Sequence, residues 1–156
     1  LINLRWVKNV NLSTNLKNKI NIEIFEFKPI GSFSFNDKFF YLSKEGQIID
    51  EYRENINERL ILFHGKHALK NASKFLKILY NIKQPQIFKI KEAYYINERR
   101  WNIKFTNDII VYLSEKNIEE SIKNYIKLIK KLNNSEIKSI KNIDLRNNQK
   151  AIMSFK

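Results

Sequence analysis

Two stretches of the chain repeat apolar residues at helical spacing, and they constrain the fold more than any other feature. The first predicts a helix with an apolar face formed by Ala68, Ala72, Phe75, Leu76, Leu79 and Tyr80. The second predicts a helix over about 118–132 with a core face formed by Ile118, Ile122, Tyr125, Ile126, Ile129 and Leu132. Asn117 is a suitable N-cap for the second helix, and Glu120 at its third position suits the positive helix end.

Short segments that alternate apolar and polar residues, or that are apolar throughout, lie before, between and after these helices. They predict strands at 30–35, 39–42, 47–49, 60–63, 86–96, 100–105, 109–113, 137–145 and 151–155. Asn36-Asp37, Glu45-Gly46 and Asn107-Asp108 supply turn residues, and the polar stretch 50–59 predicts a loop. This order predicts an α+β fold in which two helices pack on a mostly antiparallel sheet.

A separate β-hairpin is expected at the start of the chain. Residues 6–12 alternate loosely, 13–19 are polar and predict a turn, and 20–27 alternate with period two, which predicts a half-buried strand. Pro29 has no N–H to donate, so it ends this pairing and marks a module boundary. The chain begins with Leu, and its apolar runs are shorter than a membrane-spanning helix needs, so we expect a soluble fragment whose native N-terminus lies upstream.

The net charge of +13 suggests a nucleic acid or an anionic membrane as a partner. A plainer explanation is a solvated surface with biased codon usage, because Lys, Asn and Ile are all abundant. Arg, which reads phosphates and base edges with a fixed fork, occurs only six times, and the Lys residues are spread along the whole chain. We therefore favour the plainer explanation and expect no nucleic-acid partner.

The chain offers little for catalysis. It has no Cys, and its three Gly residues form no phosphate-binding loop or nucleophile elbow. His64 and His67 have a spacing that could place both rings on a metal, but no third ligand stands nearby, so we expect no metal site. Glu92, Glu98, Glu119 and Glu120 lie in charged stretches that look exposed, whereas an acid–base pair needs one carboxyl in an apolar setting. We expect no enzyme activity, no cofactor and no small-molecule substrate.

Two features point instead to a protein partner. Arg99 and Arg100 precede Trp101, whose alternation with Ile103 and Phe105 predicts that its ring packs inward. The two arginines could bind a partner's carboxylates, or they could cap the sheet edge. The last predicted strand, 151–155, has a side that either receives a partner strand or is guarded by Lys150 and Lys156. The residues alone leave both pairs of alternatives open.

Several segments, read in order, resemble the FtsQ/DivIB family of bacterial cell-division proteins. Residues 4–10 (LRWVKNV) are similar to the family's PWVK segment, and residues 20–30 to its strand that ends in E-x-x-P. Residues 41–49 (YLSKEGQII) resemble its L-(I/V)-D-x-x-G motif, residues 99–109 its RRW motif, and residues 142–146 (NIDLR) its D-L-R motif. The resemblance covers nearly the whole chain. It departs at 14–16, where the family's proline is missing, and at Asn147, where the family often has an aromatic residue.

The resemblance implies a non-catalytic divisome scaffold in the periplasm, held in the inner membrane by an N-terminal helix that this chain lacks. Residues 1–29 would be the C-terminal part of a POTRA domain, and residues 30–156 the β domain. FtsB- and FtsL-like proteins would be the partners, with an FtsB strand added to the last strand. The implied partner-binding residues are Arg99, Arg100, Arg146, Asn147, Asn148, Gln149, Lys150, Ala151, Ile152, Met153, Ser154 and Phe155.

Two other functional classes compete with this interpretation. One is a basic nucleic-acid-binding module, and the other is a POTRA-type transport or assembly protein that also binds strands at a sheet edge.

Overall fold

The computed structural model describes residues 4–15, 19–36, 38–51, 60–147 and 149–156. The strands before the first helix are β1 (Val7–Asn15), β2 (Lys19–Glu26), β3 (Gly31–Phe35), β4 (Lys38–Leu42), β5 (Ile48–Glu51) and β6 (Leu62–His64). The rest of the chain forms α1 (Ala68–Ile82), the short 3-10 helix η1 (Pro85–Lys89), β7 (Ile90–Ile96), β8 (Arg100–Phe105), β9 (Ile110–Leu113), α2 (Ile118–Ile129), α3 (Asn134–Ser139), β10 (Ile140–Leu145) and β11 (Ile152–Phe155).

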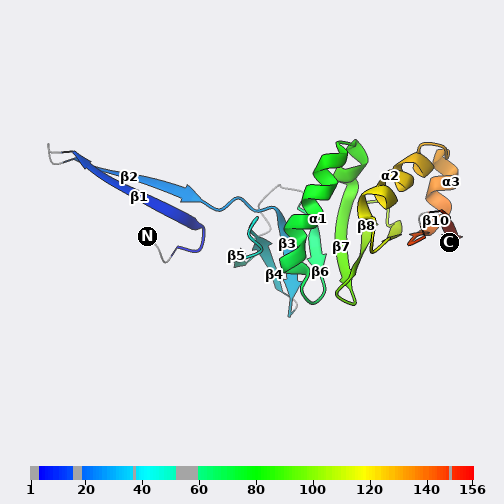
Figure 1. The fold of residues 1–156 in the computed structure, drawn as a ribbon, viewed down its shortest axis with the longest axis horizontal. Helices are drawn as coiled ribbons and strands as arrows, with labels where there is room; N and C mark the ends of the chain where they lie inside the picture. Colours follow the sequence, from blue (N-terminus) through cyan, green and yellow to red (C-terminus); the bar gives the residue numbers. More distant parts are fainter. Residues whose placement is uncertain (1–3, 16–18, 37, 52–59, 148) are drawn as a thin grey trace.

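Nine strands form one sheet in the order β11-β10-β9-β8-β7-β6-β3-β4-β5 (Figure 1). Five of its eight pairings are antiparallel, and the β3–β6, β6–β7 and β9–β10 pairings are parallel. The mostly antiparallel α+β sheet is therefore confirmed.

The two long helices cover the same face of the sheet because each is a crossover between parallel neighbours. The segment with α1 joins β6 to β7, and the segment with α2 joins β9 to β10. Both crossovers start from strands of the same direction and move toward the same edge, so right-handed connections place both helices on one face. The opposite face of β7 to β10 we call the open face.

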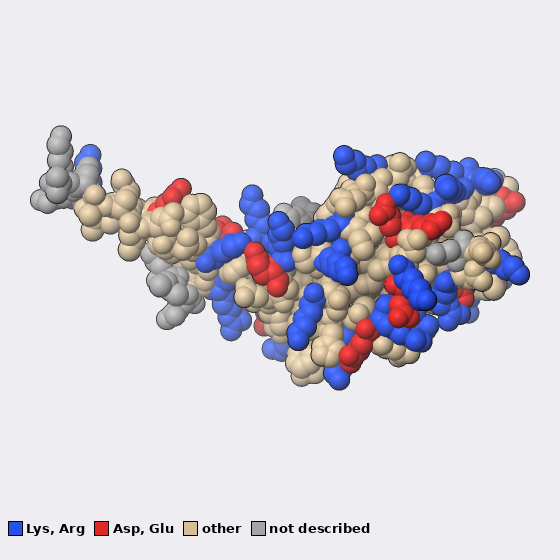
Figure 2. All heavy atoms as spheres, viewed as in Figure 1, with Lys and Arg blue, Asp and Glu red and all other residues tan. Residues whose placement is uncertain are grey.

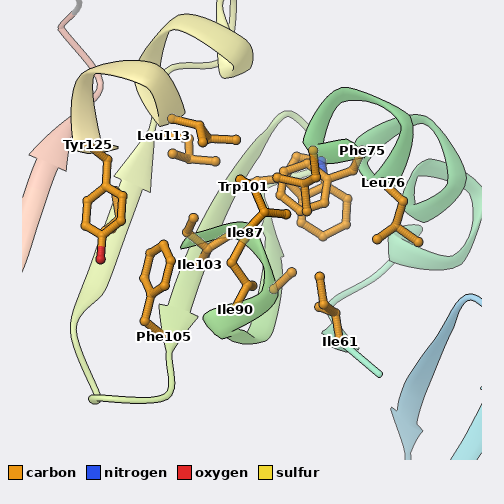
Figure 3. Packing of buried hydrophobic residues seen from close by; sticks show 14 of the residues in the cluster. Ile61, Phe75, Leu76, Ile87, Ile90, Trp101, Ile103, Phe105, Leu113 and Tyr125 are labelled. Atoms are coloured by element: carbon orange, nitrogen blue, oxygen red, sulfur yellow. The ribbon is translucent and has the colours of Figure 1, made fainter. Parts of the chain in front are cut away.

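The core lies between these helices and the sheet (Figure 3). Along β8, buried side chains alternate with half-buried ones, and the buried members are Trp101, Ile103 and Phe105. Trp101 stacks on Phe75 of α1 with ring centroids 4.6 Å apart, and Phe105 stacks on Tyr125 of α2 at 4.4 Å. The inward position predicted for Trp101 is confirmed.

Both predicted helices form, with small differences at their ends. Asn117 caps α2, its side chain accepting the Glu120 N–H at 3.3 Å. The helix ends at Ile129, three residues earlier than expected. The placement of Tyr80 on the core face of α1 is wrong: its side chain is 55% exposed, because one residue beyond the buried Leu79 turns it about 100° away.

Two predicted strands are shorter than expected because a helical turn precedes them. Residues 86–89 belong to η1, which starts at Pro85, a residue suited to a first helical position because its φ is fixed. Residues 137–139 end α3, where Asn133 and Glu136 form a capping box. Of the predicted loop 50–59, residues 50 and 51 belong to β5 and 52–59 lie outside the described residues.

The β1–β2 hairpin extends away from the large sheet (Figure 1). The prediction of a half-buried second strand is wrong, since all of β2 is exposed, including Ile22 and Ile24. The reason is that the apolar side of the hairpin has no layer packed on it among the described residues. At the base of the hairpin, the Trp6 indole and the Arg5 guanidinium each bond Asp50 of β5 at 3.2 Å.

Candidate functional site

The C-terminal strand β11 is an edge of the sheet. It pairs with β10 on one side, and no other described strand lies beside it. The backbone N–H of Lys156 donates to the Ser139 carbonyl at 2.8 Å, so the backbone of Lys156 faces β10. Successive residues of a strand point their backbone groups to opposite sides, so Ile152 and Ser154 also face β10. The N–H and C=O groups of Met153 and Phe155 therefore point away from the sheet.

The side chains of β11 differ in exposure. Met153 is half-buried and packs against the core, whereas Ile152 and Phe155 are 66% and 58% exposed. Alternation places Ile152 and Ser154 on the open face and Met153 and Phe155 on the helix-covered side. The strand thus presents unpaired backbone groups flanked by large exposed apolar side chains.

Arg146 follows β10 and forms an ion pair with Asp144, two residues earlier in the chain. Its Nε and Nη2 donate to the carboxylate at 2.9 and 2.5 Å, and its guanidinium lies 5.8 Å from the centre of the Tyr112 ring. This bond to Arg146 holds the pKa of Asp144 below its ordinary value, although partial burial works in the opposite direction. The Arg146 backbone N–H and the charge of Arg100 also help to lower that pKa.

Arg100, at the start of β8, and Arg146, just after β10, line one hollow. The hollow has a volume of about 230 Å³ and is lined by Arg100, Leu113, Ser114, Glu115, Lys116 and Arg146. The Nε of Arg100 is buried there without a hydrogen-bond partner among the described residues. Arg99 is not among the lining residues, and its Nε lies 3.7 Å from Glu115. Of the arginines expected at the site, the structure thus brings Arg100 and Arg146 together.

A second hollow, of about 390 Å³, lies on the other side of Arg146. Asp144, Arg146, Asn147, Lys150 and Ile152 line it, so it connects the arginine to the start of β11. The turn between them is held by the Asn147 side chain, which accepts the Gln149 N–H at 2.9 Å. Ala151 is exposed just before the strand, and Asn148 lies outside the described residues.

A buried serine ties together the elements that hold this site. The Ser121 hydroxyl of α2 accepts the Ser114 backbone N–H at 3.1 Å, and it lies 3.3 Å from the Leu145 carbonyl at the end of β10. Ser121 is fully buried. It therefore fixes the positions of the residues next to Glu115 and Arg146. Sequence reasoning gave no role to Ser121, Asp144 or Tyr112, although the D-x-R spacing on a strand places Asp144 and Arg146 on one face.

The two histidines have separate partners. His64 Nε2 lies 3.2 Å from Glu92, and His67 Nε2 lies 3.4 Å from Glu98. Within the described part of the chain, no group of three or more His, Asp or Glu side chains could hold a metal ion.

The expectation that Glu92 is exposed is wrong. Its side chain is 13% exposed, because it lies between Lys104 and Tyr94, which donates a hydrogen bond to it. Partial burial works to raise the pKa of Glu92, but the Tyr94 bond and the charges of Lys104 and His64 outweigh it, and the pKa is lowered. Glu92 is thus not a carboxyl with the raised pKa that a general acid at neutral pH needs.

Comparison with known proteins gives consistent matches. The sequence profile of the family described as cell division protein FtsQ/DivIB, C-terminal, matches residues 34–146. The chain is 34% identical over 153 residues to the cell division protein FtsQ of Rickettsia bellii, covering 96% of the chain and 55% of that relative. It is 32% identical to FtsQ of Rickettsia felis, with 94% and 54% covered, and 28% identical to FtsQ of Agrobacterium fabrum, with 78% and 38% covered.

The chain thus spans about half the length of the Rickettsia relatives. No helix among the described residues is long and apolar enough to cross a membrane. The family profile ends at Arg146, so the interpretation of β11 depends on its own geometry.

Proposed function

The chain belongs to the FtsQ/DivIB family of cell division proteins, and from this premise we propose that it is a non-catalytic divisome scaffold that binds FtsB- and FtsL-like proteins. A strand of the FtsB-like partner adds to β11. The observation that carries the proposal is the outward direction of the Met153 and Phe155 backbone groups at an edge strand. Such an edge provides main-chain hydrogen bonds for affinity, and alternate side chains set the register.

Arg146 and Arg100 give the site its preference for an acidic partner. Asp144 occupies two donors of Arg146. The side chain of Arg146 is 51% exposed, and its guanidinium keeps further donors for a second carboxylate. Arg100 lines the same hollow as Arg146. A partner segment with acidic residues beside its strand would meet both charges, and bonds between guanidinium and carboxylate are stronger than neutral ones.

We place the domain boundary at residue 29, with residues 1–29 as the end of a POTRA domain and 30–156 as the β domain. The exposed apolar side of the hairpin, with Leu12, Ile22 and Ile24, supports this assignment because such a side normally packs on another layer. In this proposal the whole protein spans the inner membrane once, through a helix upstream of these residues, and the described domain works in the periplasm.

The proposal is tested by removing one outward N–H from β11. Met153→Pro deletes an N–H that points away from β10, so the sheet should keep its pairing, as edge strands tolerate proline. Met153→Ala is the matched control, because it also loses the half-buried side chain but keeps the N–H. Binding of the FtsB-like protein from the same bacterium is measured by calorimetry, and folding by far-UV circular dichroism.

We expect Met153→Ala to bind with a modest loss and Met153→Pro to lose binding, while both keep the wild-type dichroism. Equal affinity of the two variants for the partner contradicts strand addition at β11.

A further inference from the structure

The helix-covered side of the molecule contains two stretches without acidic residues. From Lys66 to Lys91 the chain has seven Lys and no Asp or Glu, and from Ser121 to Ser135 it has four Lys and no Asp or Glu. The Lys residues are spread evenly along the chain, as the sequence indicates, but the acidic residues are not. Lys66, Lys91 and Lys123 pair with Glu98, Glu92 and Glu119, but the other lysines of the two stretches form no ion pair with a described residue.

The fold brings the C-terminal ends of α1 and α2, which lie in these two stretches, close together. The Nζ of Lys130, just after α2, donates to the side-chain oxygen of Gln84 between α1 and η1 at 3.2 Å. Figure 2 shows Lys and Arg side chains gathered along the edge of the molecule where α1 and α2 end in Figure 1. We call this surface the basic tip and define it as Lys77, Tyr80, Lys83, Phe88, Lys89, Lys130 and Lys131.

The lysines of the basic tip form no ion pair with any described residue, whereas the acidic groups nearby are already occupied. Asp108 pairs with Lys104 at 3.3 Å. Glu136 accepts the Asn133 backbone N–H at 2.8 Å as part of the α3 cap. The charge of the tip is thus free to attract an anionic partner.

Two aromatic rings stand among these lysines and face water. Phe88 is 71% exposed and Tyr80 is 55% exposed, although neither is needed by the core. Exposed aromatic rings flanked by lysines are typical of surfaces that settle into the headgroup region of a membrane, where the ring enters the interface and the ammonium groups meet phosphates.

We propose that the basic tip binds the headgroups of anionic lipids at a membrane surface. The tip contains Lys and no Arg. Lys is a compact point charge that suits phosphates at no fixed geometry, whereas Arg is favoured where carboxylates, phosphates or bases are recognised through a fixed fork. The combination of lysines and exposed aromatic rings therefore favours a lipid surface over nucleic acid or an acidic protein.

The test measures binding of the chain to vesicles of phosphatidylglycerol and phosphatidylcholine, and to vesicles of phosphatidylcholine alone, by co-sedimentation. The tip variant carries Lys77→Gln, Lys89→Gln and Lys131→Gln. The matched control carries Lys28→Gln, Lys44→Gln and Lys141→Gln, which are also exposed and remove the same charge elsewhere. Each lysine near an anionic surface changes affinity about fivefold, so the tip variant should bind on the order of 100-fold more weakly.

The control should bind the anionic vesicles nearly as well as wild type, because a lipid surface potential decays within about 8 Å at physiological salt. Phe88→Ser should also weaken binding, while Met153→Pro should not, which separates this surface from the proposed strand site. Equal losses in the tip and control variants, or equal binding to both kinds of vesicle, overturn the proposal. Tighter binding to an oligonucleotide, unaffected by Phe88→Ser, would assign the tip to nucleic acid instead.

Discussion

Replacing Ser121 by Ala tests whether one buried hydroxyl stabilises the elements that carry the candidate site. In the folded protein this hydroxyl accepts the Ser114 N–H at 3.1 Å and lies 3.3 Å from the Leu145 carbonyl. The methyl group of Ala fits the same space but leaves the Ser114 N–H without its acceptor, and both residues are buried. The single hydroxyl proton goes to one of two carbonyls, that of Asn117 at 3.0 Å or that of Leu145 at 3.3 Å, and this carbonyl loses a donor as well.

The magnitude follows from these two groups. An unsatisfied buried N–H costs about 1–3 kcal/mol, and a carbonyl that keeps other contacts costs less. We therefore expect Ser121→Ala to lower the free energy of unfolding by about 2–3 kcal/mol. Because Leu145 precedes Arg146, the variant should also weaken binding of an acidic partner segment.

The assay is urea unfolding followed by circular dichroism, with Ser114→Ala as the control. Ser114 is also buried, but its substitution keeps the backbone N–H that Ser121 accepts. The control should lose clearly less stability than Ser121→Ala. If both variants unfold at the same urea concentration, the Ser121 hydroxyl does not stabilise the packing of α2 on Ser114 and the end of β10.

Two further predictions concern packing and charge. Gly31→Ala places a Cβ 2.6 Å from the fully buried Phe63 ring and 3.1 Å from the Ile61 carbonyl; it should cost about 1–3 kcal/mol in urea unfolding, and an unchanged midpoint contradicts this. Asp144→Asn should lower stability at neutral pH. Because the folded pKa of Asp144 lies below its ordinary 3.8, the wild-type advantage is present above that pH and disappears as the pH falls through the lowered value. An advantage that is constant from pH 7 to pH 2 contradicts the ion pair.

The periodicity of apolar residues predicted the elements that depend on local sequence alone. Both long helices and the β7–β8–β9 meander follow from local alternation and from the Asn107-Asp108 turn, where Asp108 has a φ of 65°. The parallel pairings of β3, β6 and β7 join strands that are far apart in sequence, so no local pattern indicates them. The missed helix α3 had a visible signal, because Asn133 and Glu136 have the spacing of a capping box.

The candidate site was predictable as a set of residues but not as an arrangement. A final strand and three arginines could be located from the sequence, whereas the hollow that Arg146 shares with Arg100 depends on the pairing of β8, β9 and β10. The burial of Glu92 was missed for a similar reason. Its surroundings come from Lys104 of β8 and His64 of β6, which the chain order does not place beside it.

A partner strand that adds to β11 covers the outward backbone groups of this strand, and amide hydrogen exchange measured residue by residue detects this directly. In the free protein, the Met153 and Phe155 amides should exchange faster than those of Ile152 and Ser154, which face β10. Saturating FtsB-like partner should slow exchange at Met153 and Phe155 above all other amides of the strand. Exchange at these two amides that stays fast in the bound state contradicts strand addition at β11.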